Sequence, residues 1–249
     1  MVSRLRSIEG SAVFVTGAGS GLGEAVACAF AAEGAVVACA DIRREAAARV
    51  SEEIESGGGH AIAVHCDVAS EDSVREALSL VRDHFGRLDV AVNNAAIDHT
   101  VSVEDMTVGQ WDQVISVNLK GPFLVSKLCF GPMKQQGGGH IINIASTAAT
   151  RAWANAAAYH ASKWGLVGFG RGLSVEGRPH HIRVTTIIPG GMRTHFFDRF
   201  EEQGIPLPLE DDLQDPANVA QVIVWAAQMP AESALQEAIV TPLTETSWP

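Results

Sequence analysis

The sequence predicts an α/β fold, a parallel, doubly wound sheet of about seven strands with helices on both faces. Short apolar runs alternate with longer helix-like segments along the whole chain. The runs are continuously apolar, as is typical of strands that are covered on both faces. The strand–helix order implies right-handed parallel crossovers. A length of 249 residues fits one domain that spans 1–249.

Six apolar runs are predicted to be strands, and the segments between them are predicted to be helices. The expected strands are 12–16, 35–40, 61–66, 88–92, 140–145 and 182–188. The expected helices lie near 21–33, 43–56, 70–85, 107–136, 156–177 and 216–228.

Glycine and proline mark the joints between these elements. The glycine runs at 57–59 and 137–139 each end a helix and precede a strand, so we interpret them as helix caps and not as phosphate loops. The Gly121-Pro122 step is expected to bend or interrupt the 107–136 helix, because proline lacks a backbone donor. Periodicity is lost after Pro189, which predicts a substrate lid at about 190–215.

Composition narrows the class of protein. With 47% hydrophobic and 19% charged residues, the chain is not of the disordered class. The net charge of −11 argues against nucleic acid or an anionic membrane as partner. No run approaches the ~18 apolar residues of a membrane span, and the start does not resemble a signal peptide, so we expect a cytoplasmic protein. The four cysteines and nine histidines show no metal-ligand spacing, so we expect free thiols and no metal site.

The first predicted strand leads directly into a glycine-rich turn, Thr16-Gly17-Ala18-Gly19-Ser20-Gly21-Leu22-Gly23, and then into a helix. Glycines here let the backbone approach a pyrophosphate, which the helix N-terminus stabilises. A tight turn without a ligand is the alternative. The position between strand one and helix one favours nucleotide binding.

Acidic residues follow the second and third strands. Asp41, beside Ile42, is placed to accept hydrogen bonds from ribose hydroxyls and to repel a 2′-phosphate, which favours NAD over NADP. The neighbouring Arg43-Arg44 pair is the competing signal for a phosphate. Asp67, with Val68, is placed to meet the adenine, and its alternative role is to cap the next helix.

The only tyrosine of the chain, Tyr159, stands four positions before Lys163. In a helix these two side chains share one face. A phenol ionises near ~10, so a base at neutral pH requires a shift of about three units, or about 4 kcal/mol. An adjacent cation favours the phenolate and is one means of achieving that shift.

With these residues in place, the chain resembles the short-chain dehydrogenase/reductase family over about residues 8–245. The glycine turn matches T-G-x-x-x-G-x-G, and residues 93–96 match N-N-A-G except for Ala96. Asn118 falls at the family's catalytic asparagine, and Ser146 stands 13 residues before Tyr159. The resemblance implies a Rossmann-type fold and a dinucleotide cofactor. The cofactor-binding residues so expected are Gly17, Gly19, Ser20, Gly21, Leu22, Gly23, Asp41, Ile42, Asp67, Val68, Asn94, Ala95, Ala96, Tyr159, Lys163, Pro189, Gly190 and Thr194.

The resemblance also implies roles for four catalytic residues. Tyr159 would be the general acid/base, and Ser146 would hydrogen-bond the reacting substrate oxygen. Lys163 would lower the tyrosine pKa and bind the nicotinamide ribose, while Asn118 would shape a helix so that a water links Lys163 to solvent. The reaction would be NAD-dependent hydride transfer between a secondary alcohol or ketone and nicotinamide.

Two other functions remain open. One is an NADPH-dependent ketoreductase of the 3-oxoacyl-thioester type, and the other is a non-catalytic dinucleotide-binding regulator, which would not need the serine, tyrosine and lysine together. The small-molecule substrate is expected to contact Trp153, His99, His195 and Phe196. Interior glycines in the 156–177 helix allow close backbone approach, and in the family this helix often packs on its symmetry mate, so we expect a homotetramer or homodimer.

Overall fold

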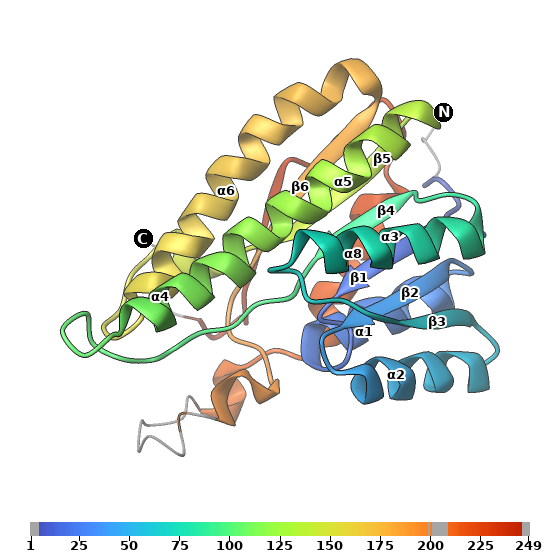
Figure 1. Cartoon of the computed structure of the whole chain (residues 1–249). Coiled ribbons are helices and arrows are strands. Elements are labelled where there is room, and N and C mark those ends of the chain that lie inside the picture. Colours follow the sequence, from blue (N-terminus) through green and yellow to red (C-terminus); the bar gives the residue numbers. More distant parts are fainter. Residues whose placement is uncertain (1–4, 199, 201–208, 246–249) are drawn as a thin grey trace.

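A computed structural model describes residues 5–198, 200 and 209–245 (Figure 1). Its centre is a seven-stranded, all-parallel sheet with the strand order β3-β2-β1-β4-β5-β6-β7, which confirms the predicted fold class. The strands are β1 Ala12–Thr16, β2 Val36–Asp41, β3 His60–His65, β4 Val90–Asn93, β5 Gly139–Ile144, β6 Ile182–Pro189 and β7 Glu237–Val240.

The seventh strand was counted in the prediction but not located in the sequence. Strand β7 lies at the edge of the sheet and pairs only with β6 in the described structure. None of its four side chains is fully buried. Its apolar run, Ala238-Ile239-Val240, is only three residues long, which is too short to identify a strand from the sequence.

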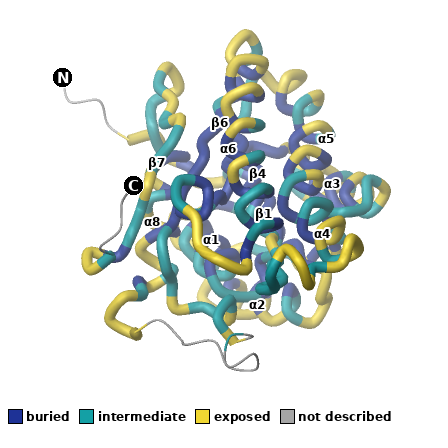
Figure 2. The backbone as a smooth tube through the Cα atoms, turned by 90° about the vertical axis from the view of Figure 1, so that its left-hand side faces the viewer, coloured by how far each residue is buried: buried dark blue, intermediate teal, exposed yellow. Residues whose placement is uncertain are grey.

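Helices cover both faces of the sheet. They are α1 Gly21–Ala32, α2 Arg44–Ser56, α3 Glu71–Phe85, α4 Val108–Ile115, α5 Gly121–Gln135, α6 Ala157–Gly177 and α8 Pro216–Gln228. One core packs α1, α2 and α8 against one face, and a second core packs α3, α5 and the end of α6 against the other. Figure 2 shows the central strands as buried and the outer turns of the helices as exposed.

The predicted 107–136 helix is interrupted, as expected, but by a turn that precedes the proline. A π-helical turn, Ser116–Lys120, separates α4 from α5. Pro122 is the second residue of α5, which directly follows this turn. The wider turn changes the direction of side chains locally, and it contains Asn118.

The glycines of α6 fall into two groups. A Cβ on Gly170 would lie 2.5 Å from Thr186 Oγ1 of β6, so this glycine allows the helix to approach the sheet. Around Gly168 and Gly172, the described structure has nothing within 4 Å of such an atom. This outer face is where a second copy of the chain would pack, and the oligomer stays a prediction.

Candidate active site

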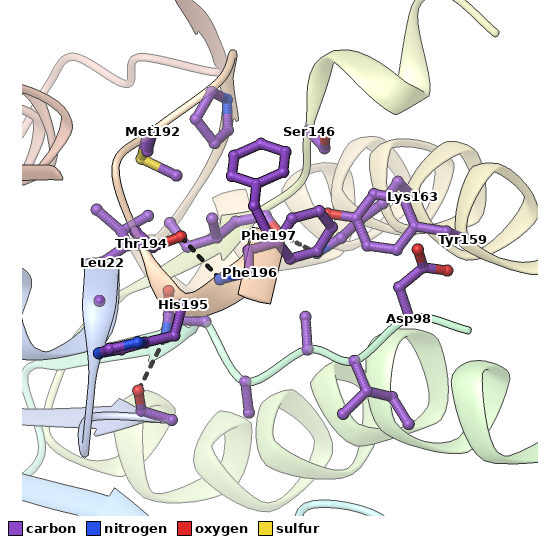
Figure 3. A pocket seen from close by; sticks show the side chains of 18 of the residues that line it. Leu22, Asp98, Ser146, Tyr159, Lys163, Met192, Thr194, His195, Phe196 and Phe197 are labelled. Atoms are coloured by element: carbon purple, nitrogen blue, oxygen red, sulfur yellow. Dashed lines mark hydrogen bonds between the residues drawn. The ribbon is translucent and has the colours of Figure 1, made fainter. Parts of the chain in front are cut away.

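A cavity of about 1160 Å³ opens at the edge of the sheet that is formed by the carboxyl ends of the parallel strands. One end is formed by the glycine turn after β1 and by Asp41 at the end of β2. The other end is formed by Ser146, Tyr159 and the segment after β6. Figure 3 shows this second end, with Ser146, Tyr159 and Lys163 on one side and Phe196 and Phe197 beside them.

The end of β4 holds the glycine turn in place. Asn94 Nδ2 donates to the carbonyl oxygens of Thr16 and Gly17, at 3.0 and 3.2 Å. A Cβ on Gly23 would collide with the Gly17 carbonyl oxygen, so the helix can approach the turn only with glycine there. The Ser20 side chain makes no capping hydrogen bond, which leaves the first amides of α1 open to an anionic ligand.

The Asp41 carboxylate is buried and fixed from both sides. One oxygen accepts from the Gly19 N–H at 3.0 Å, and the other accepts from the Arg43 N–H at 2.9 Å. The Arg43 guanidinium is 62% exposed and donates to Ser20 Oγ at 3.3 Å. Thus a carboxylate and a guanidinium flank the same part of the cavity.

Asp67 and Val68 line the cavity after β3. Asp67 Oδ1 accepts from the Ala69 N–H at 2.9 Å, whereas Ser70 is the residue that caps α3. The helix-capping alternative for Asp67 is therefore taken by Ser70. Asp67 instead shapes the turn that precedes the helix.

Tyr159 and Lys163 are both buried, with 7% and 2% of their surfaces exposed. Both lie on α6, and the Lys163 ammonium is 5.5 Å from the centre of the Tyr159 ring. Lys163 Nζ donates to the Ile144 carbonyl oxygen at 2.8 Å. Burial lowers the pKa of Lys163 from 10.5 to about 8. Below that pH the site holds a buried positive charge beside a phenol.

Ser146 follows β5 and faces the same end of the cavity. Its Oγ accepts from the Ala148 N–H at 3.1 Å. Because that contact uses only a lone pair, the hydroxyl hydrogen stays available for another acceptor.

Asn118 lies behind the cavity and not in its lining. Its side chain exchanges two 2.8 Å hydrogen bonds with the Ile97 backbone and donates to Ser162 Oγ at 3.1 Å. Asn118 therefore joins the loop after β4 to α6, the helix of Tyr159 and Lys163.

Three of the four predicted substrate residues, Trp153, His195 and Phe196, line the cavity. The Phe196 ring centre is 5.6 Å from that of Tyr159. His99 is not among the described lining residues, so this expectation is not met. Its Nε2 lies 2.8 Å from Oε1 of Gln113, which does line the cavity. In the predicted lid, 199 and 201–208 lie outside the described residues.

An ion pair in the lining was missed by sequence reasoning. Arg151, after Ser146, pairs with Glu245 near the C-terminus, and both line the cavity. They are 94 positions apart in the sequence, and no local pattern connects them. Only the fold brings them together.

Metal and membrane features are absent from the described parts of the chain. No cluster of three or more potential metal ligands occurs there. No helix in those parts has both the length and the apolar character to cross a bilayer. The four cysteines are free.

Comparison with known proteins agrees with this geometry. The family described as short chain dehydrogenase matches residues 11–204. The D-threitol dehydrogenase of Mycolicibacterium smegmatis is 38% identical over 182 residues, covering 73% of this chain and 70% of that protein. The trans-4-hydroxycyclohexanecarboxylate dehydrogenase of Sinomonas cyclohexanicum is 39% identical over 186 residues, covering 72% and 71%.

A solved structure gives the same result. A metagenomic short-chain oxidoreductase in complex with NADP is 32% identical, with a TM-score of 0.83, and the match covers 96% of this chain and 100% of that one. The chain therefore belongs to the short chain dehydrogenase family, and it is an oxidoreductase that acts on an alcohol or ketone with the NAD(P) cofactor typical of that family.

Proposed function

We propose that this protein is an NAD-dependent dehydrogenase that transfers a hydride reversibly between a secondary alcohol or ketone and nicotinamide, with Tyr159 as general acid/base. The observation that carries the proposal is the buried Tyr159–Lys163 pair beside Ser146. This pair stands at the end of a cavity that begins at a glycine-rich turn.

Each of the four predicted catalytic side chains has a separate role in the proposed reaction. The Tyr159 phenol exchanges a proton with the substrate oxygen. The Lys163 ammonium, charged below its pKa of about 8, favours the phenolate. Ser146 donates its hydroxyl hydrogen to the substrate oxygen, since the Ala148 amide uses only a lone pair of that hydroxyl. Asn118 holds the Ile97 loop against α6 and keeps this helix in place.

The residues along the cavity support the assignment of a dinucleotide. The open amides at the start of α1 suit the pyrophosphate, and Asp41 suits the adenosine ribose. Asp67 and Val68 would meet the adenine, and Lys163 would reach the nicotinamide ribose. When bound, the cofactor supplies the hydride acceptor or donor. The remaining residues assigned to it are Gly17, Gly19, Ser20, Gly21, Leu22, Gly23, Ile42, Asn94, Ala95, Ala96, Tyr159, Pro189, Gly190 and Thr194.

The choice of NAD over NADP rests on Asp41. Its carboxylate is buried at 5% exposure and held by two amides, so it cannot turn away from a 2′-phosphate. The second candidate, an NADPH-dependent ketoreductase, is favoured by the exposed Arg43 guanidinium next to Ser20. We expect the fixed Asp41 carboxylate to have the stronger effect of the two. It is buried, and two negative charges repel each other more strongly where water is partly excluded, so it would repel a 2′-phosphate.

The proposed substrate is a small secondary alcohol or ketone with a partly apolar body, because Trp153, Phe196 and Phe197 line its end of the cavity. Two relatives are named for a polyol and for a ring alcohol, so both classes belong in a test panel. We also propose that the protein is cytoplasmic and that it forms a homotetramer or homodimer. Light scattering would test the oligomeric state.

The function is tested with secondary alcohols and ketones and both cofactors, followed by nicotinamide absorbance. We expect turnover with NAD to exceed turnover with NADP. The substitution Tyr159→Phe keeps the ring and removes the proton, and we expect it to lower kcat by about 10²–10⁴-fold. Near wild-type turnover in this variant would remove Tyr159 from the mechanism.

A further inference from the structure

The His160 imidazole lies behind the cavity wall and holds the loop that follows Ser146. It is not among the described lining residues. Its Nδ1 lies 2.8 Å from the Ala148 carbonyl oxygen, and the Trp153 backbone N–H contacts its Nε2 at 3.1 Å. The imidazole also meets the Trp153 indole edge to face, with ring centres 4.5 Å apart.

These two hydrogen bonds determine the tautomer of the His160 imidazole. A carbonyl oxygen only accepts, so Nδ1 of His160 carries the hydrogen. A backbone N–H only donates, so Nε2 presents its lone pair to Trp153. The neutral Nδ1–H imidazole satisfies both partners at once.

The same contacts connect the two hydroxyl groups of the site. Ala148 donates its N–H to Ser146 Oγ, while its carbonyl oxygen accepts from His160. His160 directly follows Tyr159 in α6, and the buried Ala148 packs against Tyr159 in a small apolar cluster. His160 thus ties the Ser146 side of the cavity to the helix that carries the phenol.

Trp153 depends on this attachment for its position. The segment 151–156 belongs to no helix or strand, so no ladder of backbone hydrogen bonds holds it. Trp153 is 44% exposed and lines the cavity. Both its backbone N–H and its indole contact His160. The backbone contact holds the segment, and the ring contact must break for the indole to leave the wall.

We infer that His160 is a positioning residue that latches the 148–153 segment onto α6 and thereby fixes the Trp153 side chain as a substrate-facing wall. His160 touches neither the reacting atoms nor the cavity. It determines substrate binding through Trp153. The kinetic consequences rest on the proposed function, whereas the latch itself does not.

Three substitutions separate the contacts of His160. In His160→Gln, the longer side chain can place its amide oxygen where Nε2 of His160 lies, so that this oxygen accepts from the Trp153 N–H. In His160→Asn, the shorter amide can donate to the Ala148 carbonyl but offers Trp153 no acceptor. His160→Phe keeps a ring against the indole and removes both hydrogen bonds. His60→Phe changes an exposed histidine on β3 and is the matched control.

Amide hydrogen exchange on the unliganded protein, resolved to Trp153 by NMR, measures the latch without requiring activity. We expect the Trp153 amide to exchange about fivefold faster or more in the Asn and Phe variants, the factor for one net hydrogen bond. The Gln variant and the His60 control should retain wild-type exchange. Wild-type exchange in His160→Phe would overturn the latch.

Steady-state kinetics with an alcohol that the wild-type enzyme oxidises measure the consequence. We expect KM to rise about fivefold or more in the Asn and Phe variants and to stay within about twofold in the Gln variant. The change in kcat should be smaller, and affinity for the dinucleotide should not change. Once Trp153 is replaced by leucine, His160→Asn should raise KM no further.

Equal increases in KM for the Gln and Asn variants, or additive effects with Trp153→Leu, would overturn the positioning role. A wild-type protein that oxidises no alcohol and binds no dinucleotide would instead refute the proposed function. The exchange measurement would still decide the latch in that case.

Discussion

Replacement of Lys163 by methionine is expected to stabilise the protein and to lower its turnover. The ammonium is 2% exposed, and burial lowers its pKa from 10.5 to about 8. Each pKa unit corresponds to about 1.4 kcal/mol, so burial of the charge costs about 3 kcal/mol at neutral pH. Loss of the hydrogen bond to the Ile144 carbonyl offsets about 1 kcal/mol of this. The free energy of unfolding should therefore rise by about 2 kcal/mol.

The stability effect of Lys163→Met should depend on pH, because the folded and unfolded states differ in the pKa of Lys163. The folded-state pKa of Lys163 lies below the unfolded one, so between about pH 8 and 10.5 the unfolded state binds more protons. The penalty is complete below about pH 8 and disappears toward 10.5. Lys163→Met lacks this penalty at every pH. Its stability advantage over wild type should therefore shrink as the pH rises through this window.

Urea unfolding of the cofactor-free protein at about pH 7 and about pH 10 measures both quantities. Lys134→Met, at an exposed position of α5, is the matched control and should change stability little at either pH. Turnover of Lys163→Met should fall by about 10²-fold or more. If the variant were less stable than wild type near pH 7, or if its advantage did not vary with pH, the reasoning would be refuted.

Two further predictions follow from the cofactor end of the cavity and from α6. Asp41→Ser should lower the dissociation constant for NADP about tenfold or more and raise that for NAD, because Arg43 and Ser20 remain without the opposing carboxylate. Fluorescence titration measures both dissociation constants. An unchanged preference for NAD would contradict the role assigned to Asp41. Gly170→Ala should lower the free energy of unfolding by about 1–3 kcal/mol, because its Cβ would meet Thr186 Oγ1. Gly168→Ala, which meets nothing, should be neutral or stabilising by up to about 1 kcal/mol, and equal effects would refute the close approach.

Local sequence patterns determined most of the fold and much of the candidate site. Continuous apolar runs identified strands β1 to β6. Five of these strands are largely buried, and burial on both faces removes the polar alternation. The edge strand β3 has only Val64 buried, but its apolar run over 61–64 was still sufficient to identify it. The glycine runs at 57–59 and 137–139 contain Gly58 and Gly137 at φ of 86° and 91°, which confirms the predicted left-handed caps. The glycine turn, Asp41 and the Tyr159–Lys163 pair were found because each depends on residues that are close together in the chain.

The tertiary structure decided what depends on contacts between distant segments. Strand β7 has an apolar run of only three residues, Ala238-Ile239-Val240, and only the fold places it at the edge of the sheet. Arg151 and Glu245 meet only because the loop after β5 and the C-terminal segment close over the same cavity. His99 was expected to contact the substrate, yet the fold pairs it with Gln113, whereas His160 is placed by the fold against the Trp153 loop. Spacing along the chain fixes which side chains share a helix face or a turn, whereas their partners across the cavity are fixed only when the sheet and its helices pack.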